Sequence, residues 1–175
     1  MEVTLKPWKQ EDVDFVARCA DDREIARWLR DVFPHPYTRQ DAEDFVRLCI
    51  EADEEQALFR VVRMDGQAVG SIALTRGTDV CRKSAELGYW LGRSFHGKGI
   101  MTRAVEQICA LGFERWDIVR IFAEPYADNA PSRRVLEKAG FQMEGILRQS
   151  VCKWGKIQDS CVYAMLKEDM LDASR

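Results

Sequence analysis

The chain has 175 residues and a formal charge of −3, because 29 Asp and Glu residues outnumber 26 Lys and Arg residues. Hydrophobic residues make up 46% and charged residues 31%, the balance of a globular protein that can bury a sizeable core. The acidic balance argues against a general nucleic-acid binder, which would present a basic surface.

Membrane, secretion and metal signals are weak. The longest stretch without a charge covers residues 66–75, well short of a membrane span. The start of the chain lacks the basic and apolar segments of a secretory signal, so we expect a cytoplasmic protein that binds no membrane. Six cysteines without Cys-x-x-Cys spacing, beside only two histidines, predict free thiols and no metal site.

The first third of the chain predicts a short strand followed by helices. Residues 3–5 favour a strand, and residues 12–20 and 23–29 favour two short helices. Prolines in the following segment exclude regular helix there. Thr38 can cap a third helix, with Asp41 three residues later in capping-box register. The apolar face of this helix would consist of Ala42, Phe45, Val46 and Cys49.

The rest of the chain predicts a hairpin first and helical crossovers later. Asp65-Gly66 is a hairpin turn signal, and Gly140 is the expected stop of the last helix. The expected strands cover 58–62, 68–74, 84–91, 119–123, 143–151 and 159–166, and the expected helices cover 100–111 and 129–139. This order predicts one domain, residues 1–175, of the α/β or α+β class with a mixed sheet.

A glycine-rich turn between a strand and a helix is the first chemical signal. Residues 86–102 read as strand, turn and helix. A helix start has unpaired N–H groups and a dipole that favours an anion. Gly97 and Gly99 lack a Cβ, so a diphosphate could approach the main chain there. Lys98 adds positive charge and Thr102 a hydroxyl, although a tight turn without a ligand explains the same spacing.

Residues 92–99 also match the P-loop pattern up to its last position. A P-loop needs Ser or Thr after its lysine to hold Mg²⁺. Gly99 occupies that place, so a nucleotide hydrolase is the less favoured alternative.

The second signal covers residues 129–141. Asn129 can cap a helix whose first turn tolerates Pro131. Helix formation explains most of these residues, but it explains Ser132, Arg133 and Arg134 less well.

Together, the two stretches resemble the acetyl-CoA-binding signature of the GNAT N-acetyltransferases. Residues 97–102 resemble the pyrophosphate loop, and Asn129-x-x-Ser132 with residues 137–141 resembles the second cofactor motif. Residues 144–148 and Asp159, with the opening segments 5–12 and 31–38, are similar to the branch that includes ribosomal-protein alanine and serine N-acetyltransferases. The resemblance covers nearly the whole chain. It implies a twisted mixed sheet that splays open near its middle, with helices on both faces.

The resemblance also implies ligands and residue roles. Acetyl-CoA would be the cosubstrate, and the acceptor would be an amine on a protein N-terminus or a small molecule, attacked directly in a ternary complex by a monomer or homodimer. Asn129 and Ser132 would reach the sulfur end of the cofactor. Main-chain groups of Tyr89, Trp90 and Leu91 would contact pantetheine. The diphosphate would be surrounded by His96, Gly97, Lys98, Gly99, Ile100, Met101 and Thr102.

Three positions depart from the family pattern. His96 stands where Gln or Arg is usual, and Met101 where Gly or Ala is usual. Leu136 stands where many relatives carry a tyrosine as general acid. Ser132 is then the expected hydroxyl beside the leaving thiolate, with Tyr126 as a further candidate. A regulatory module that binds acetyl-CoA without turnover is the alternative function.

Two carboxylates are candidates for the base that the attacking amine requires. Glu124 stands five residues before Asn129, at the expected end of a strand. Glu86 lies in the strand that the resemblance places at the split. Some relatives use each of these positions, although either residue could be an ordinary strand-end carboxylate. We favour Glu124.

Overall fold

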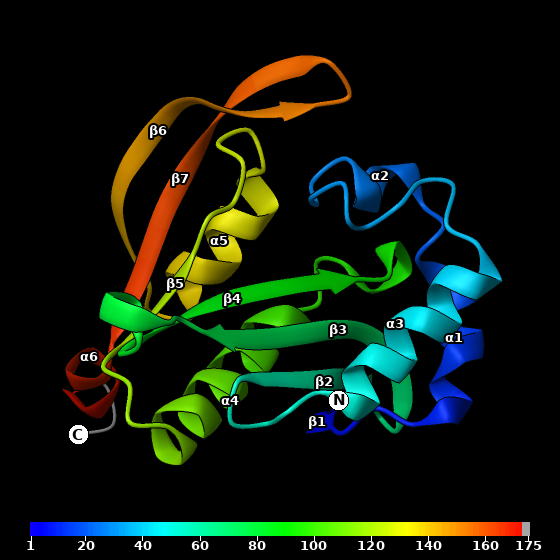
Figure 1. Ribbon diagram of the computed structural model, residues 1–175, viewed down its shortest axis with the longest axis horizontal. Coiled ribbons are helices and arrows are strands. Elements are labelled where there is room, and N and C mark those ends of the chain that lie inside the picture. Colours follow the sequence, from blue (N-terminus) through cyan, green and yellow to red (C-terminus); the bar gives the residue numbers. More distant parts are fainter. Residues whose placement is uncertain (173–175) are drawn as a thin grey trace.

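The computed structural model describes residues 1–172 as a seven-stranded sheet with flanking helices, in the strand order β1-β2-β3-β4-β5-β7-β6 (Figure 1). The strands are β1 Val3–Lys6, β2 Ala57–Met64, β3 Gln67–Arg76, β4 Ser84–Leu91, β5 Arg120–Ala123, β6 Gln142–Lys153 and β7 Lys156–Leu166. The helices are α1 Val13–Cys19, α2 Arg23–Ala26, α3 Arg39–Glu51, α4 Ile100–Arg115, α5 Ala130–Lys138 and α6 Lys167–Asp172. No helix in this part of the chain is long and apolar enough to cross a membrane.

The predicted element order is confirmed, with differences near the ends of elements. The second helix stops at Ala26 instead of continuing to residue 29. The last hairpin is longer than predicted, because β6 and β7 are joined by a tight turn at Trp154 and Gly155, where φ is 49° and 79°. Positive φ at both central residues is typical of the type I′ turns that suit a hairpin. Helix α6 was not predicted.

The sheet is splayed between β4 and β5, as the resemblance implied. Among the strands of residues 1–172, these two form the one parallel pair, and their register covers only residues 84–86 against 120–122. Beyond Glu86, β4 continues to Leu91, whereas β5 ends at Ala123. Within the described part of the chain, the backbone of residues 87–91 therefore has no strand partner on the β5 side. A wedge-shaped split opens there in the middle of the sheet (Figure 1).

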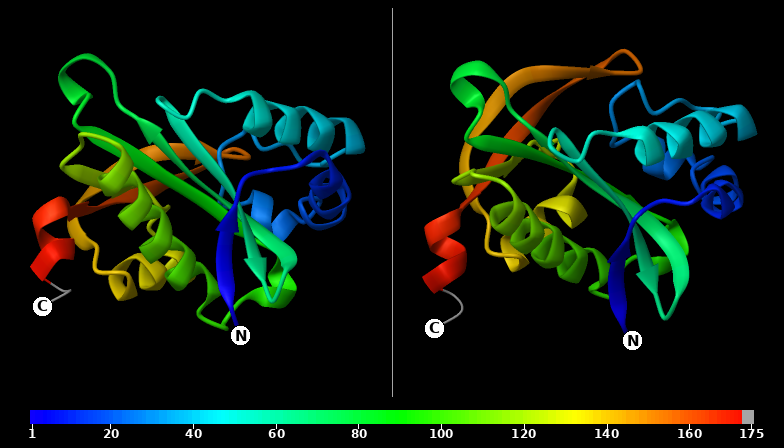
Figure 2. Two further views of the ribbon diagram at one scale, coloured as in Figure 1. Left: turned by 90° about the horizontal axis from the view of Figure 1, so that it is seen from below. Right: turned by 60° about the horizontal axis from the view of Figure 1, so that its bottom comes forward.

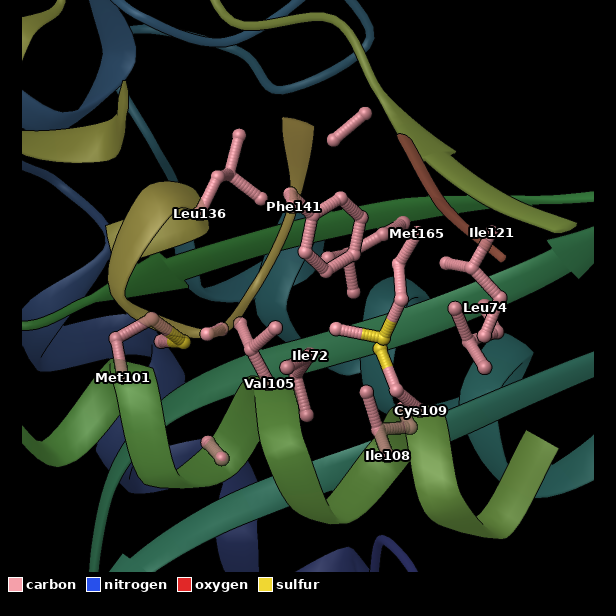
Figure 3. Close-up of a cluster of buried hydrophobic side chains, with 14 of the residues drawn as sticks. Ile72, Leu74, Met101, Val105, Ile108, Cys109, Ile121, Leu136, Phe141 and Met165 are labelled. Carbon is pink, nitrogen blue, oxygen red and sulfur yellow. The ribbon is translucent and has the colours of Figure 1, made fainter. Parts of the chain in front are cut away.

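Helices cover both faces of the sheet, which confirms the expected layers. Helices α4 and α5 lie on one face, and α1 to α3 lie on the other (Figure 2). On the first face, α4 packs its buried side chains against β3, β5 and β7, and Leu136 joins them from α5 (Figure 3). On the second face, the rings of Phe15 and Trp90 stack at a centroid distance of 5.8 Å.

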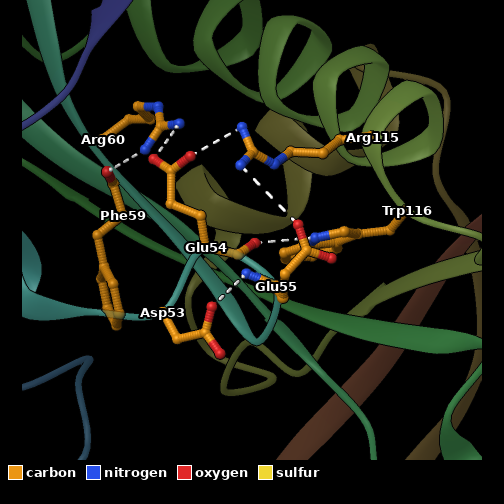
Figure 4. Close-up of polar contacts among 7 residues, drawn as sticks. All are labelled: Asp53, Glu54, Glu55, Phe59, Arg60, Arg115 and Trp116. Atoms are coloured by element: carbon orange, nitrogen blue, oxygen red, sulfur yellow. Dashed lines mark hydrogen bonds and ion pairs between the residues drawn. The ribbon is translucent and has the colours of Figure 1, made fainter.

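Helix α4 is also held at its C-terminal end by a charged cluster (Figure 4). The Glu54 carboxylate accepts from Arg60 of β2 and from Arg115 of α4, both at 2.8 Å. The Trp116 indole N–H donates to the Glu54 carbonyl at 3.0 Å. Because the Arg60 side chain is only 10% exposed, losing its partner would leave a nearly buried charge unpaired. The cluster holds the C-terminal end of α4 against β2. The opposite end of α4 lies beside the split.

The tip of the β6–β7 hairpin touches α2 and the segment between α2 and α3. The Lys153 ammonium lies 2.8 Å from the Asp31 carboxylate. The Arg23 guanidinium carbon lies 4.3 Å from the centre of the Trp154 ring. The centres of the Trp154 and His35 rings are 6.0 Å apart. These contacts join the C-terminal hairpin to the N-terminal helices across the open side of the split (Figure 1).

Candidate active site

The glycine loop lies between β4 and the first turn of α4, beside the split. Gly99 is the N-cap of α4 with φ of 72°, and no side chain caps the helix there. Gly97 has φ of 75°, and a Cβ built on either glycine would meet nothing within 4 Å. The first N–H groups of α4 thus have no capping side chain, and they follow two residues whose backbone favours glycine. This arrangement suits a diphosphate.

The other residues of the loop divide into anchors and exposed groups. Ile100 and Met101 are buried in the α4 core, so they can offer a ligand only main-chain groups. His96 forms a hydrogen bond between its Nε2 and the Leu91 carbonyl at 2.9 Å, which ties the loop to the end of β4. Lys98 is exposed, with its ammonium 5.6 Å from the centre of the Phe95 ring. A positive charge therefore stands at the loop.

Strand β4 offers its main chain to the split, while its side chains are held on the two faces. Trp90 is buried among the residues of the α1–α3 face. Tyr89 points to the other face and packs at the edge of the α4 core. The free backbone edge of residues 87–91 is what an extended ligand segment would pair with.

Asn129, Ser132 and Tyr89 come together beside this edge. The predicted cap is confirmed, because the Asn129 side-chain oxygen accepts from the Ser132 N–H at 3.2 Å. The Tyr89 hydroxyl lies 2.8 Å from Ser132 Oγ and 3.2 Å from the Ser132 carbonyl oxygen, and its one hydrogen can be donated to either. Burial raises the pKa of Tyr89 to about 12, although its bond to Ser132 partly opposes the rise. The resemblance implied only a main-chain role for Tyr89, and this side-chain contact was not predicted.

The two carboxylates have different surroundings. Glu86 accepts from Arg30, which follows α2, with an Nη2–Oε1 distance of 2.6 Å. Glu86 therefore faces the α1–α3 side of the sheet. Glu124 follows the end of β5 and is exposed, and within residues 1–172 it has no hydrogen bond or ion pair to another side chain. Of the two carboxylates, Glu124 is therefore the one without a side-chain partner in the described residues.

Tyr126 stands on the same side as the Glu86–Arg30 pair. Its hydroxyl donates to the Leu29 carbonyl at 3.2 Å, and its ring lies 6.4 Å from that of Trp28. Burial, and next the nearby Asp31 carboxylate, raise the pKa of Tyr126, with Arg30 opposing. Its hydroxyl holds the α2 segment against the end of β5, which makes Tyr126 a wall residue beside the split.

Leu136 and Arg133 are integrated into the fold. Leu136 has no exposed surface and belongs to the α4 core. Arg133 donates to the Tyr163 hydroxyl and to the Ala127 carbonyl, both at 3.1 Å. Arg133 thus braces α5, and position 136 contributes packing. No group of three or more His, Cys, Asp and Glu side chains in the described residues is arranged to hold a metal ion.

A tyrosine at position 136 is expected to destabilise the protein instead of supplying an acid. Leu136→Tyr adds volume and a hydroxyl to a fully packed site. Overpacking of this kind lowers the free energy of unfolding by about 1–3 kcal/mol. Chemical denaturation of the parent and the variant measures the change, with Leu136→Met as a volume-conserving control that should lose less than about 1.5 kcal/mol. A Tyr variant with parental stability and faster turnover would contradict the assignment of this position to the core.

Comparison with known proteins agrees with this geometry. Residues 2–142 match the family described as acetyltransferase (GNAT) domain. The chain is 28% identical over 170 residues to an uncharacterized N-acetyltransferase, p20, of Bacillus licheniformis, covering 95% of this chain and 94% of p20. It is 36% identical over 105 residues to the putative ribosomal N-acetyltransferase YdaF of Bacillus subtilis, covering 60% of this chain and 57% of YdaF.

A solved structure extends the likeness to the whole fold. Mycobacterium smegmatis RimJ, in complex with a coenzyme A disulfide, superposes with a TM-score of 0.83 at 27% identity, covering 99% of this chain and 90% of RimJ. The match over residues 2–142 includes the glycine loop and the Asn129 motif and replaces the P-loop alternative. The chain therefore belongs to the GNAT acetyltransferase family.

Proposed function

We propose that this chain, acting as one domain, transfers the acetyl group of acetyl-CoA to a primary amine by direct attack in a ternary complex. The observation that carries the proposal is the glycine loop at the uncapped start of α4, which opens beside the unpaired edge of β4. One edge would pair with an extended pantetheine arm, and the loop would hold the diphosphate.

The residues present fit such a cosubstrate. A Cβ would project into the open space at Gly97 and Gly99, where a diphosphate has to approach the main chain. The exposed Lys98 offers a counter-charge for the phosphates. The bound coenzyme A disulfide in the RimJ structure supports the same assignment. When bound, acetyl-CoA supplies an activated acetyl group on a thiolate leaving group.

The chain's own side chains would divide the proton transfers. In the reaction a bond forms between the amine nitrogen and the acetyl carbon, and the bond from that carbon to sulfur breaks. Glu124 would take the proton that the amine loses, directly or through water. Ser132 would donate a hydrogen bond to the departing thiolate. Glu86, already bound to Arg30, would shape the acceptor side.

The acceptor is proposed to be a protein N-terminus or a small-molecule amine. The description of YdaF as a putative ribosomal N-acetyltransferase supports the first class. A panel of N-terminal peptides and small primary amines, assayed for release of free thiol from acetyl-CoA, tests both classes. Release with at least one amine supports the transferase, whereas binding without release would favour the regulatory module.

Acetyl-CoA is expected to raise the thermal stability of the chain. A ligand that binds only the native state at 100 times its Kd stabilises it by about 2.7 kcal/mol. Thermal denaturation with increasing acetyl-CoA, together with isothermal calorimetry, measures the effect. Adenosine monophosphate, which lacks the pantetheine arm, is the control and should stabilise much less. An unchanged Tm and no binding heat at millimolar acetyl-CoA would falsify the proposed cosubstrate.

A further inference from the structure

The contact between Tyr89 and Ser132 crosses from a strand to a helix. Tyr89 belongs to β4 and Ser132 to the first turn of α5, which follows β5 on the other side of the split. Among residues 1–172, the Tyr89 hydroxyl has hydrogen bonds only to Ser132, at 2.8 Å to Oγ and 3.2 Å to the carbonyl. A buried hydroxyl left unpaired is costly, so this contact fixes the position of the phenol.

The hydroxyl pair has two hydrogen-bond arrangements. In the first, Tyr89 donates to Ser132 Oγ, and the hydrogen of the serine hydroxyl remains available to a third group. In the second, Ser132 Oγ donates to Tyr89, and the phenol donates to the Ser132 carbonyl. Each hydroxyl has one hydrogen, so only the first arrangement lets Ser132 donate elsewhere. Because its pKa is raised to about 12, Tyr89 keeps its hydrogen in either arrangement near neutral pH.

We propose that Tyr89 is a positioning residue that turns the Ser132 hydroxyl into a donor toward the leaving sulfur of coenzyme A. The 2.8 Å contact allows Tyr89 to donate to Ser132 Oγ, and in that arrangement the serine hydrogen is directed away from the phenol. The Asn129 side chain holds the Ser132 N–H at the same time, so the residue is fixed from two sides. The inference rests on the proposed function, because it assumes that the sulfur lies beside Ser132.

The first test follows the thiol of bound coenzyme A and needs no acceptor. A hydrogen-bond donor favours the thiolate and lowers the pKa of the thiol. Ultraviolet absorbance of the thiolate, recorded against pH with coenzyme A bound, gives this pKa for each variant. We expect Ser132→Ala to raise it by about one, the equivalent of one hydrogen bond. Tyr89→Phe should produce part of that rise, and the double variant should match Ser132→Ala alone.

The second test measures turnover of acetyl-CoA with an accepted amine. Tyr89→Phe should lower kcat about 3- to 10-fold, the effect of one hydrogen bond, while the KM for acetyl-CoA stays the same. In the Ser132→Ala background the same change should have no further effect. Tyr163→Phe is the matched control, because it also removes a tyrosine hydroxyl that contacts α5, through Glu137 at 2.7 Å, without touching Ser132. It should leave the pKa of the bound thiol unchanged.

The outcomes separate this inference from the proposed function. A parental kcat and a parental thiol pKa in Tyr89→Phe would overturn the positioning role. The same loss of kcat on Tyr89→Phe in the parent and in Ser132→Ala would also overturn it. Loss of an alkaline limb of the pH profile in Tyr89→Phe would also overturn it, since Tyr89 would then act as an acid itself. If coenzyme A binds and the pKa of its thiol changes in the variants as expected, but no amine is acetylated, only the proposed transfer to an amine is contradicted. Failure of coenzyme A to bind overturns both.

Discussion

Glu124→Gln is expected to lower kcat about 100- to 10,000-fold, the usual contribution of a general base. Glu124 is exposed at the end of β5 and has no side-chain partner in the described residues, so its carboxylate is available to an incoming ammonium group. The amide of Gln keeps the shape and cannot take the proton. Affinity for acetyl-CoA should stay nearly parental, because the glycine loop is on another element. Steady-state kinetics with saturating amine, combined with calorimetry, measures both quantities.

The loss in Glu124→Gln should shrink as pH rises, because the acceptor amine then loses its proton without help. Glu86→Gln is the control, because its amide oxygen can still accept a hydrogen bond from Arg30 although the charge is lost. A larger loss in Glu86→Gln would exchange the two roles. Parental activity in both variants would mean that water or the backbone carries the proton, and the assignment of a carboxylate base would be withdrawn.

Gly99→Val is expected to weaken acetyl-CoA binding about 100-fold or more. At φ of 72° a β-branched residue is strained, and its side chain would stand over the N–H groups at the start of α4. Losing two hydrogen bonds to a charged diphosphate corresponds to about 3 kcal/mol or more, which is about a 100-fold change in Kd. Isothermal calorimetry gives the affinity, and circular dichroism shows whether the variant remains folded.

Gly66→Val supplies the matched control for backbone strain. Gly66 has φ of 84°, and a Cβ there would also meet nothing within 4 Å, but it lies in the turn between β2 and β3, away from the split. This variant should lose stability while binding acetyl-CoA like the parent. Similar affinity losses in both variants would show that strain alone, and not the blocked loop, explains the effect at Gly99. Gly99→Asn, which tolerates positive φ, should still bind weakly.

Elements with local signals could be predicted closely from the sequence. The capping box of Thr38 and Asp41 marked the start of α3, and the glycine-rich turn with Gly97 and Gly99 marked the start of α4. Both depend on residues within one helical turn, which is the range over which capping acts. The last hairpin was predicted too short, because Trp154-Gly155 lacks the Asn-Gly or Asp-Gly pattern that usually identifies such a turn.

Contacts between distant segments could not be predicted in this way. The Arg30–Glu86 ion pair joins residues that are 56 apart in the chain, and the Tyr89–Ser132 contact joins residues that are 43 apart. Neither partner has an unusual spacing that points to the other. The glycine loop was therefore located from the sequence, whereas the hydrogen-bonding state of the groups around it required the folded chain.

The contact between the hairpin tip and the α2–α3 segment changes the mechanical character of the sheet. Two half-sheets joined by three residue pairs could rotate relative to each other about that short pairing. Here the far ends are also connected, through Lys153 with Asp31 and through Trp154 with Arg23. The split is thus enclosed by a closed ring of chain segments. Because the two halves are connected at both ends, we expect them to melt in a single calorimetric transition.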